Sequence, residues 1–139
     1  MSEDNKIISE WKRLAYMDLS SARLLFEMHH PIPVEIVCFH SQQAAEKMLK
    51  CFLVFKEFEP PKIHDLRELL KLCVKFESDF DKLRRETDTL TDYAVLPRYP
   101  AELELDETDG ETAIRYANKI MDYVNVLIFK TVDENKTDT

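Results

Sequence analysis

The strongest constraint on the fold is a long stretch, residues 35–58, that contains neither glycine nor proline. Pro31 and Pro33 come just before it, and Pro60 and Pro61 follow it. Proline is accepted at the first turn of a helix but breaks a helix further along, so this punctuation predicts one long helix.

Apolar side chains cover this predicted helix nearly all the way round. One face is formed at spacings of three, four and seven by Val37, Ala44, Met48, Phe52 and Phe55, and a second set comprises Ile36, Phe39, Ala45, Leu49 and Leu53. A helix that is apolar on most sides is buried on most sides. We therefore expect a central helix, covered by its own chain and by a second copy of it.

Composition excludes several classes of function. The chain has a single glycine, Gly110, which excludes glycine-rich phosphate loops and argues against a fold rich in β-hairpins. The net charge of -8 argues against general attraction to phosphate backbones, so we expect no DNA partner. There is no apolar run of the roughly 18 residues that a membrane span needs, and we expect a cytoplasmic protein without a membrane partner. Cys38, Cys51 and Cys73 form no CxxC pair and are interpreted as reduced thiols in or near the core, so we expect no metal and no cofactor.

Further helices are predicted on either side of the central one. Apolar periodicity predicts a helix over residues 7–29, which ends where a proline follows. Asp65, with Glu68 three residues later, is close to a capping box and predicts a helix start. Ser78 with Asp81 predicts the cap of a further short helix.

Residues 91–110 combine two prolines with a dense run of acidic residues and are predicted to form one long loop. Thr108 with Glu111 then predicts a capping box for a last helix over residues 111–131, and a polar tail follows. The chain is thus predicted to be all-α, an up-and-down bundle of about five helices with one long loop before the last helix. We expect a single domain over residues 1–139, with a core over about 5–130 and a flexible tail over 132–139.

A polar group interrupts the apolar surface of the central helix. His40, Gln43 and Lys47 lie at i, i+3 and i+7 and share one face. They have two interpretations: polar residues that fix helix packing, or side chains that meet a ligand.

Three blocks of sequence, taken together, resemble one known family. These blocks are Phe39, His40, Gln43, Ala44 or Ala45, Glu46 and Lys47; then Lys62, His64, Asp65 and Leu66; then Tyr93, Arg98, Tyr99 and Pro100. Their order and separation resemble the HEPN family (higher eukaryotes and prokaryotes nucleotide-binding domain). The resemblance covers roughly residues 5–130.

The resemblance implies a helical bundle that commonly dimerises, and handling of nucleotide or RNA. It also implies a frequent partner, a small nucleotidyltransferase on a separate chain, with some such pairs acting as toxin and antitoxin. Many members are metal-independent ribonucleases with an Arg and a His four to six residues later, late in the bundle. Here the spacing occurs only at Arg23 with His29 and His30, in the first helix, where the family does not place it. The catalytic residues are therefore left unassigned, and we do not expect an enzyme.

The remaining candidates form a nucleotide-binding set. Lys47 and Arg98 would contact phosphate. Tyr93 or Tyr99 would stack on a base, and His40, Gln43 and His64 would hydrogen-bond a base or ribose. Each of these residues also has a purely structural interpretation.

The function expected from the sequence is a nucleotide-binding or partner-binding subunit, forming a homodimer and pairing with a nucleotidyltransferase. One alternative is a ribonuclease in which His64 or His40 works with Arg98 across the fold. The other is a purely structural dimeric interaction module.

Overall fold

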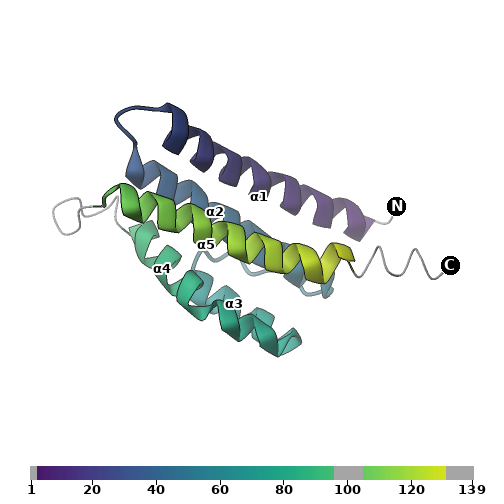
Figure 1. Ribbon diagram of the computed structural model, residues 1–139. Helices are drawn as coiled ribbons and strands as arrows, with labels where there is room; N and C mark the ends of the chain where they lie inside the picture. Colours follow the sequence, from purple (N-terminus) through teal and green to yellow (C-terminus); the bar gives the residue numbers. More distant parts are fainter. Residues whose placement is uncertain (1–2, 96–104, 131–139) are drawn as a thin grey trace.

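The computed structural model describes residues 3–95 and 105–130, and within them the chain is all-α (Figure 1). There are five α-helices in these parts, with a 3-10 turn before the fourth and a π turn after the fifth. In chain order they are α1 Glu3–Met28, α2 Val34–Phe55, α3 Leu66–Phe76, η1 Ser78–Leu83, α4 Arg84–Val95, α5 Glu107–Asn125 and η3 Val126–Lys130. This confirms the predicted helical bundle. None of the described helices is long and apolar enough to cross a membrane.

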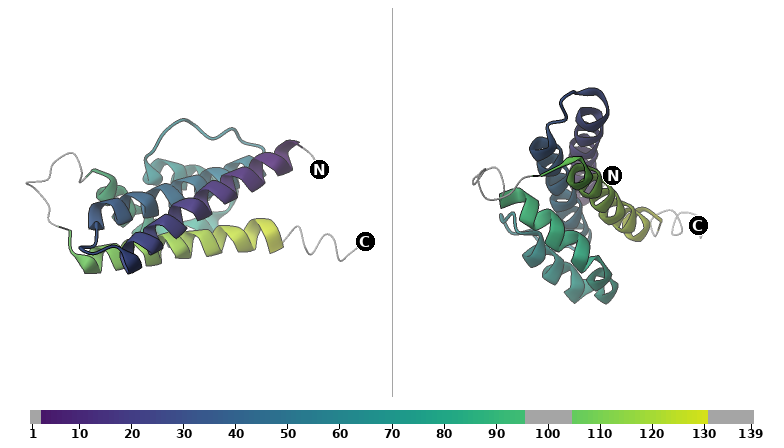
Figure 2. Two further views of the ribbon diagram at one scale, coloured as in Figure 1. Left: turned by 90° about the horizontal axis from the view of Figure 1, so that it is seen from above. Right: turned by 60° about the vertical axis from the view of Figure 1, so that its left-hand side comes forward.

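Helix α2 is the centre of the bundle, as its sequence predicted. It packs against α1, α3, α4 and α5, which surround it in Figures 1 and 2. Val37, Ala44 and Met48 on its inward face are fully buried. The chain does not cover α2 on every side, however, because Ile36 is 50% exposed and Phe39 is 44% exposed. The outer face near the start of α2 is therefore open.

Three aromatic rings join the C-terminal end of α2 to the rest of the core. The Phe52 and Phe80 ring centroids lie 4.5 Å apart, and Phe80 meets Tyr123 edge-on with centroids 4.9 Å apart. Tilted and edge-to-face pairs of this kind are favoured by the aromatic quadrupole. The contact links α2, η1 and α5, three elements that are distant in sequence.

Helix α2 ends at Phe55, three residues earlier than predicted, because its C-terminus forms a Schellman motif. The Phe58 amide donates to the Leu53 carbonyl at 2.9 Å, and the Glu57 amide donates to the Val54 carbonyl at 2.8 Å. This turn places Glu57 at a φ of 59°, a left-handed conformation that usually belongs to glycine. Apolar periodicity does not reveal such an ending, since Phe58, three residues after Phe55, continues the apolar pattern.

Asp65 was correctly predicted as the residue that caps the start of α3. The Asp65 carboxylate accepts a hydrogen bond from the Arg67 amide, but Glu68 does not complete a capping box. The predicted Ser78 cap is wrong, because Glu77 is the N-cap residue of η1 and makes no side-chain cap hydrogen bond.

The loop predicted over residues 91–110 is shorter in the structure, because helices extend into it from both sides. Helix α4 continues to Val95, and α5 begins at Glu107 with a capping box made by Asp106 and Asp109. The predicted box of Thr108 with Glu111 is therefore wrong. The acidic run misled the prediction, since several of its members sit at favourable positions for a helix start.

Gly110 lies inside α5 instead of ending a loop. A Cβ atom at this position would lie 3.3 Å from the ring carbons Cδ2 and Cε2 of Phe26 on α1. Such a separation is closer than ordinary van der Waals contact, so the absent side chain allows α1 and α5 to approach at this level.

The three cysteines are free and buried, as predicted. Burial raises the pKa of the Cys38, Cys51 and Cys73 thiols to about 12. At neutral pH they are therefore protonated, and a protonated thiol is neither a nucleophile nor a metal ligand.

Replacing Glu57 by glycine is expected to stabilise the protein by about 1 kcal/mol, because the left-handed backbone penalises a side chain but not glycine. The matched control is Lys56→Gly, one residue earlier, where φ is -87°. That change is expected to destabilise the folded protein by roughly 0.5–1 kcal/mol, because glycine at this position only increases the conformational entropy of the unfolded chain. Urea unfolding of the two variants measures both effects. Equal signs for the two variants would contradict the assignment of the turn.

Candidate polar site on helix α2

A strip of polar side chains runs along the outer face of α2. We define the polar strip as Asp18 of α1, the α2 residues His40, Gln42, Gln43, Glu46, Lys47 and Lys50, and His64, which precedes α3. The α2 members recur at helical spacings, so they project on the side of the helix away from α5 and the core. Two carboxylates, Asp18 and Glu46, organise the strip.

The Asp18 carboxylate joins α1 to α2. Its Oδ1 lies 2.9 Å from His40 Nδ1, and its Oδ2 accepts a hydrogen bond from the Lys47 ammonium. All three side chains are partly shielded from solvent, with 13% of Asp18, 28% of His40 and 24% of Lys47 exposed. The sequence pattern correctly placed His40 and Lys47 together, but it did not identify the acid between them.

The Glu46 carboxylate joins α2 to the segment before α3. Its side chain is only 4% exposed and lies 3.3 Å from Lys50 Nζ and 3.0 Å from His64 Nδ1. Gln42 Nε2 donates to the His64 carbonyl oxygen at 3.1 Å, which holds the same segment by its backbone. His64 was predicted as a site residue. Its ring contact with Glu46, 18 residues earlier in the sequence, brings it beside α2.

Gln43 belongs to the strip through a neighbour. Its Nε2 donates to Gln42 Oε1 at 3.1 Å, and Gln42 in turn bonds the His64 backbone. Gln42, Glu46 and Lys50 were missed as site residues, although a buried acid four residues before a lysine is a recognisable helical ion pair.

The two histidines are arranged in a similar way. Each ring has Nδ1 against a carboxylate, Asp18 for His40 and Glu46 for His64, so the carboxylate fixes the orientation of the ring. The His64 side chain is 77% exposed, whereas His40 is 28% exposed. A carboxylate that orients an imidazole is a common arrangement in acid–base chemistry, and it serves equally to fix a binding side chain.

Tyr93 is not part of the polar strip. It lies on α4, and its hydroxyl donates to Asp109 Oδ1 on α5 at 3.2 Å. Burial, together with the nearby Asp109 carboxylate, raises the pKa of the Tyr93 phenol, which keeps it protonated. The remaining predicted residues, Arg98 and Tyr99, lie outside the described residues.

The arginine and histidines that match the ribonuclease spacing do not face a common partner. The Arg23 guanidinium donates to Asn118 Oδ1 on α5 at 2.6 Å. His29 lies beyond the end of α1, with Nδ1 3.0 Å from the Pro31 carbonyl oxygen. Over residues 3–95 and 105–130, no three His, Cys, Asp or Glu side chains gather in a group that would hold a metal ion.

Glu46→Gln is expected to lower the free energy of unfolding by roughly 3 kcal/mol, because it leaves the buried Lys50 ammonium without its counter-charge. The double variant Glu46→Gln, Lys50→Met removes both charges and is expected to regain most of this loss. The control Glu68→Gln breaks an exposed pair with Lys71 and is expected to cost less than about 1 kcal/mol. Chemical denaturation measures all three. A double variant no more stable than Glu46→Gln would contradict the buried-pair interpretation.

Comparison with known proteins identifies the family and the fold of the chain. The HEPN domain family model matches residues 8–127. The crystal structure of an archaeal HEPN homologue is 26% identical and superposes with a TM-score of 0.67, covering 87% of this chain and 97% of that one. Among curated proteins, no match was found. Because the family model spans most of the sequence, including both blocks that Glu46 and His64 join, this chain belongs to the HEPN domain family.

Proposed function

We propose that this HEPN-domain protein is a nucleotide-binding subunit that forms a homodimer and acts beside a separate nucleotidyltransferase chain. The observation that carries the proposal is the partly exposed pair of His40 and Lys47 around Asp18, next to the partly exposed ring of Phe39. Family membership supports the same class of ligand.

The chemistry of this end of the strip suits a nucleotide. Lys47 offers an ammonium for phosphate and His40 a ring nitrogen, and both can exchange Asp18 for a phosphate oxygen. The Phe39 ring meets His40 edge-on at a centroid distance of 5.6 Å, and its exposed face would stack on a base. Gln43 adds an amide between them, able to donate and accept.

Exposed apolar side chains support the proposed protein contacts. Leu24 and Met28 near the end of α1 are 62% and 72% exposed, and Ile36 and Phe39 near the start of α2 are also exposed. All four lie at the end of the bundle where α1 turns into α2. We define them as the apolar end patch. Side chains of this kind gathered at one end suit burial against another protein.

A nucleotide at 100 times its dissociation constant should stabilise the protein by about 2.7 kcal/mol, a shift that is easily seen in thermal unfolding. ATP and AMP are the probes, and the ligand-induced shift is compared within each variant. We expect the Lys47→Ala variant to lose most of the shift, because phosphate loses its ammonium partner. The control Lys82→Ala changes an exposed lysine on η1 and should keep the full shift. Equal shifts in Lys47→Ala and the parent protein would contradict binding at this site.

The partner is tested by recovering the tagged protein from its own source cells and identifying the bound chains by mass spectrometry. We expect a nucleotidyltransferase at near-stoichiometric amounts, and we expect the Ile36→Asp, Phe39→Asp variant to lose it. The control Val126→Asp changes an exposed residue at the opposite end of the bundle and should retain it. Recovery of the homodimer alone would contradict the paired system.

One observation favours a second function, cleavage of RNA without a metal. His64 is exposed and held by the buried Glu46, which is the arrangement of a general base or acid. Cleavage of RNA by the pure protein in EDTA, abolished by His64→Ala, would establish this function instead. If the protein is a dimer whose melting temperature does not change with nucleotide and which does not cleave RNA, the remaining hypothesis is the purely structural interaction module.

A further inference from the structure

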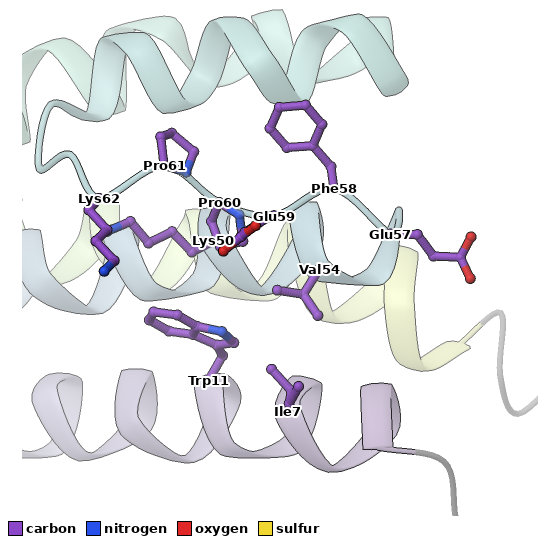
Figure 3. Close-up of a pocket in the computed structure, with 10 residues that line it drawn as sticks. All are labelled: Ile7, Trp11, Lys50, Val54, Glu57, Phe58, Glu59, Pro60, Pro61 and Lys62. Atoms are coloured by element: carbon purple, nitrogen blue, oxygen red, sulfur yellow. The ribbon is translucent and has the colours of Figure 1, made fainter.

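A pocket of about 660 Å³ lies at the end of the bundle away from the apolar end patch. It is formed where the first turns of α1 and the last turns of α2 meet the segment over residues 57–62. Its walls include Ile7, Trp11, Lys50, Val54, Pro60 and Pro61 (Figure 3). A volume of several hundred Å³ with mainly apolar walls is typical of small-molecule sites.

The apolar walls suit a flat ring. Trp11 reaches from α1 into the space below the segment, and Pro60 and Pro61 lie on the opposite side (Figure 3). Indole and proline rings present broad, rigid apolar surfaces that lose little conformational entropy on contact. A planar aromatic group can therefore lie between Trp11 and the segment that carries Pro60.

Lys50 supplies the polar group in this pocket. Its side chain is only 8% exposed, and its Nζ lies 6.0 Å from the centre of the Trp11 ring. An ammonium has three N–H donors, and within the described residues Lys50 Nζ donates a hydrogen bond to Glu46 Oε2 at 3.3 Å. Buried donors without acceptors are costly, so an acceptor in the pocket would be stabilised by Lys50.

The other charges at the pocket limit the negative charge that a ligand can carry there. Lys62 adds a second ammonium, and the Glu57 carboxylate points away from the cavity in Figure 3. Glu59 also lines the pocket, and Glu46 already neutralises Lys50 in part. This balance suits one carboxylate and opposes a group with several negative charges.

We propose that this pocket binds a small planar aromatic monocarboxylic acid. The ring lies between Trp11 and the segment at Pro60, and the carboxylate accepts hydrogen bonds from the Lys50 ammonium. This site is separate from the Asp18 end of the polar strip, so it does not depend on the proposed function.

The experiment uses Trp11 as its reporter, because the sequence contains a single tryptophan. The protein labelled with 15N gives one indole N–H signal, which is followed during titration with 2-naphthoate and, separately, with its neutral isostere 2-naphthamide. We expect a saturable shift with 2-naphthoate and at least tenfold weaker binding of 2-naphthamide, because only the acid pairs with Lys50.

Two variants test the two parts of the site. Lys50→Met is expected to weaken the binding of 2-naphthoate at least tenfold and to leave the binding of 2-naphthamide unchanged. Val54→Trp is expected to fill the cavity and weaken both probes, and it keeps the Glu46–Lys50 pair, so it tests the site even where Lys50→Met does not fold. The control Lys75→Met removes an exposed lysine of α3 outside the pocket and should bind as the parent protein does.

Three results would overturn the proposal. Equal affinity for 2-naphthoate and 2-naphthamide would show that Lys50 does not recognise the carboxylate. Unchanged binding by Val54→Trp would place the probe elsewhere. Displacement of 2-naphthoate by AMP, with AMP binding more tightly, would assign the pocket to nucleotides instead.

Discussion

The buried carboxylate of Glu46 is the interaction on which much of this structure depends. It lies on the most apolar helix of the chain and would be costly there without partners, because burial removes its hydration. Lys50 and His64 supply those partners at 3.3 and 3.0 Å. The same contact holds the segment that leads into α3, so the charge is stabilised only when α2 and that segment are in place together. This contact joins two of the sequence blocks that resemble the HEPN family.

Helix α2 serves the core and the candidate site at once because of the helical repeat. Residues such as Ala44 and Met48 project toward α1 and α5, while Gln43 and Lys47, one residue away in each case, project outward. The polar strip is therefore carried by the most firmly packed element of the bundle. Side chains mounted in this way keep their positions without a ligand, which reduces the entropy lost when one binds.

Much of the fold could be predicted, whereas the site could be predicted only in part. His40, Gln43 and Lys47 were grouped correctly because neighbours on one helix face follow from the 3.6-residue repeat alone. Asp18 was not found, because its partners lie on a different helix and its own sequence context is that of an ordinary solvated residue. Tyr93 was grouped with the strip through family resemblance, yet it hydrogen-bonds Asp109 on α5, a contact that no spacing rule describes.

The sequence by itself determined the all-α architecture and the central position of α2, since proline punctuation and apolar periodicity are local properties of the chain. Tertiary structure decided the partners of charges and the contacts between helices. The lack of a side chain at Gly110 matters because the Phe26 ring of α1 packs against it, and Lys47 is paired because α1 brings Asp18 beside it. Such outcomes depend on distances between elements far apart in the chain, and those distances are set by how the whole core packs.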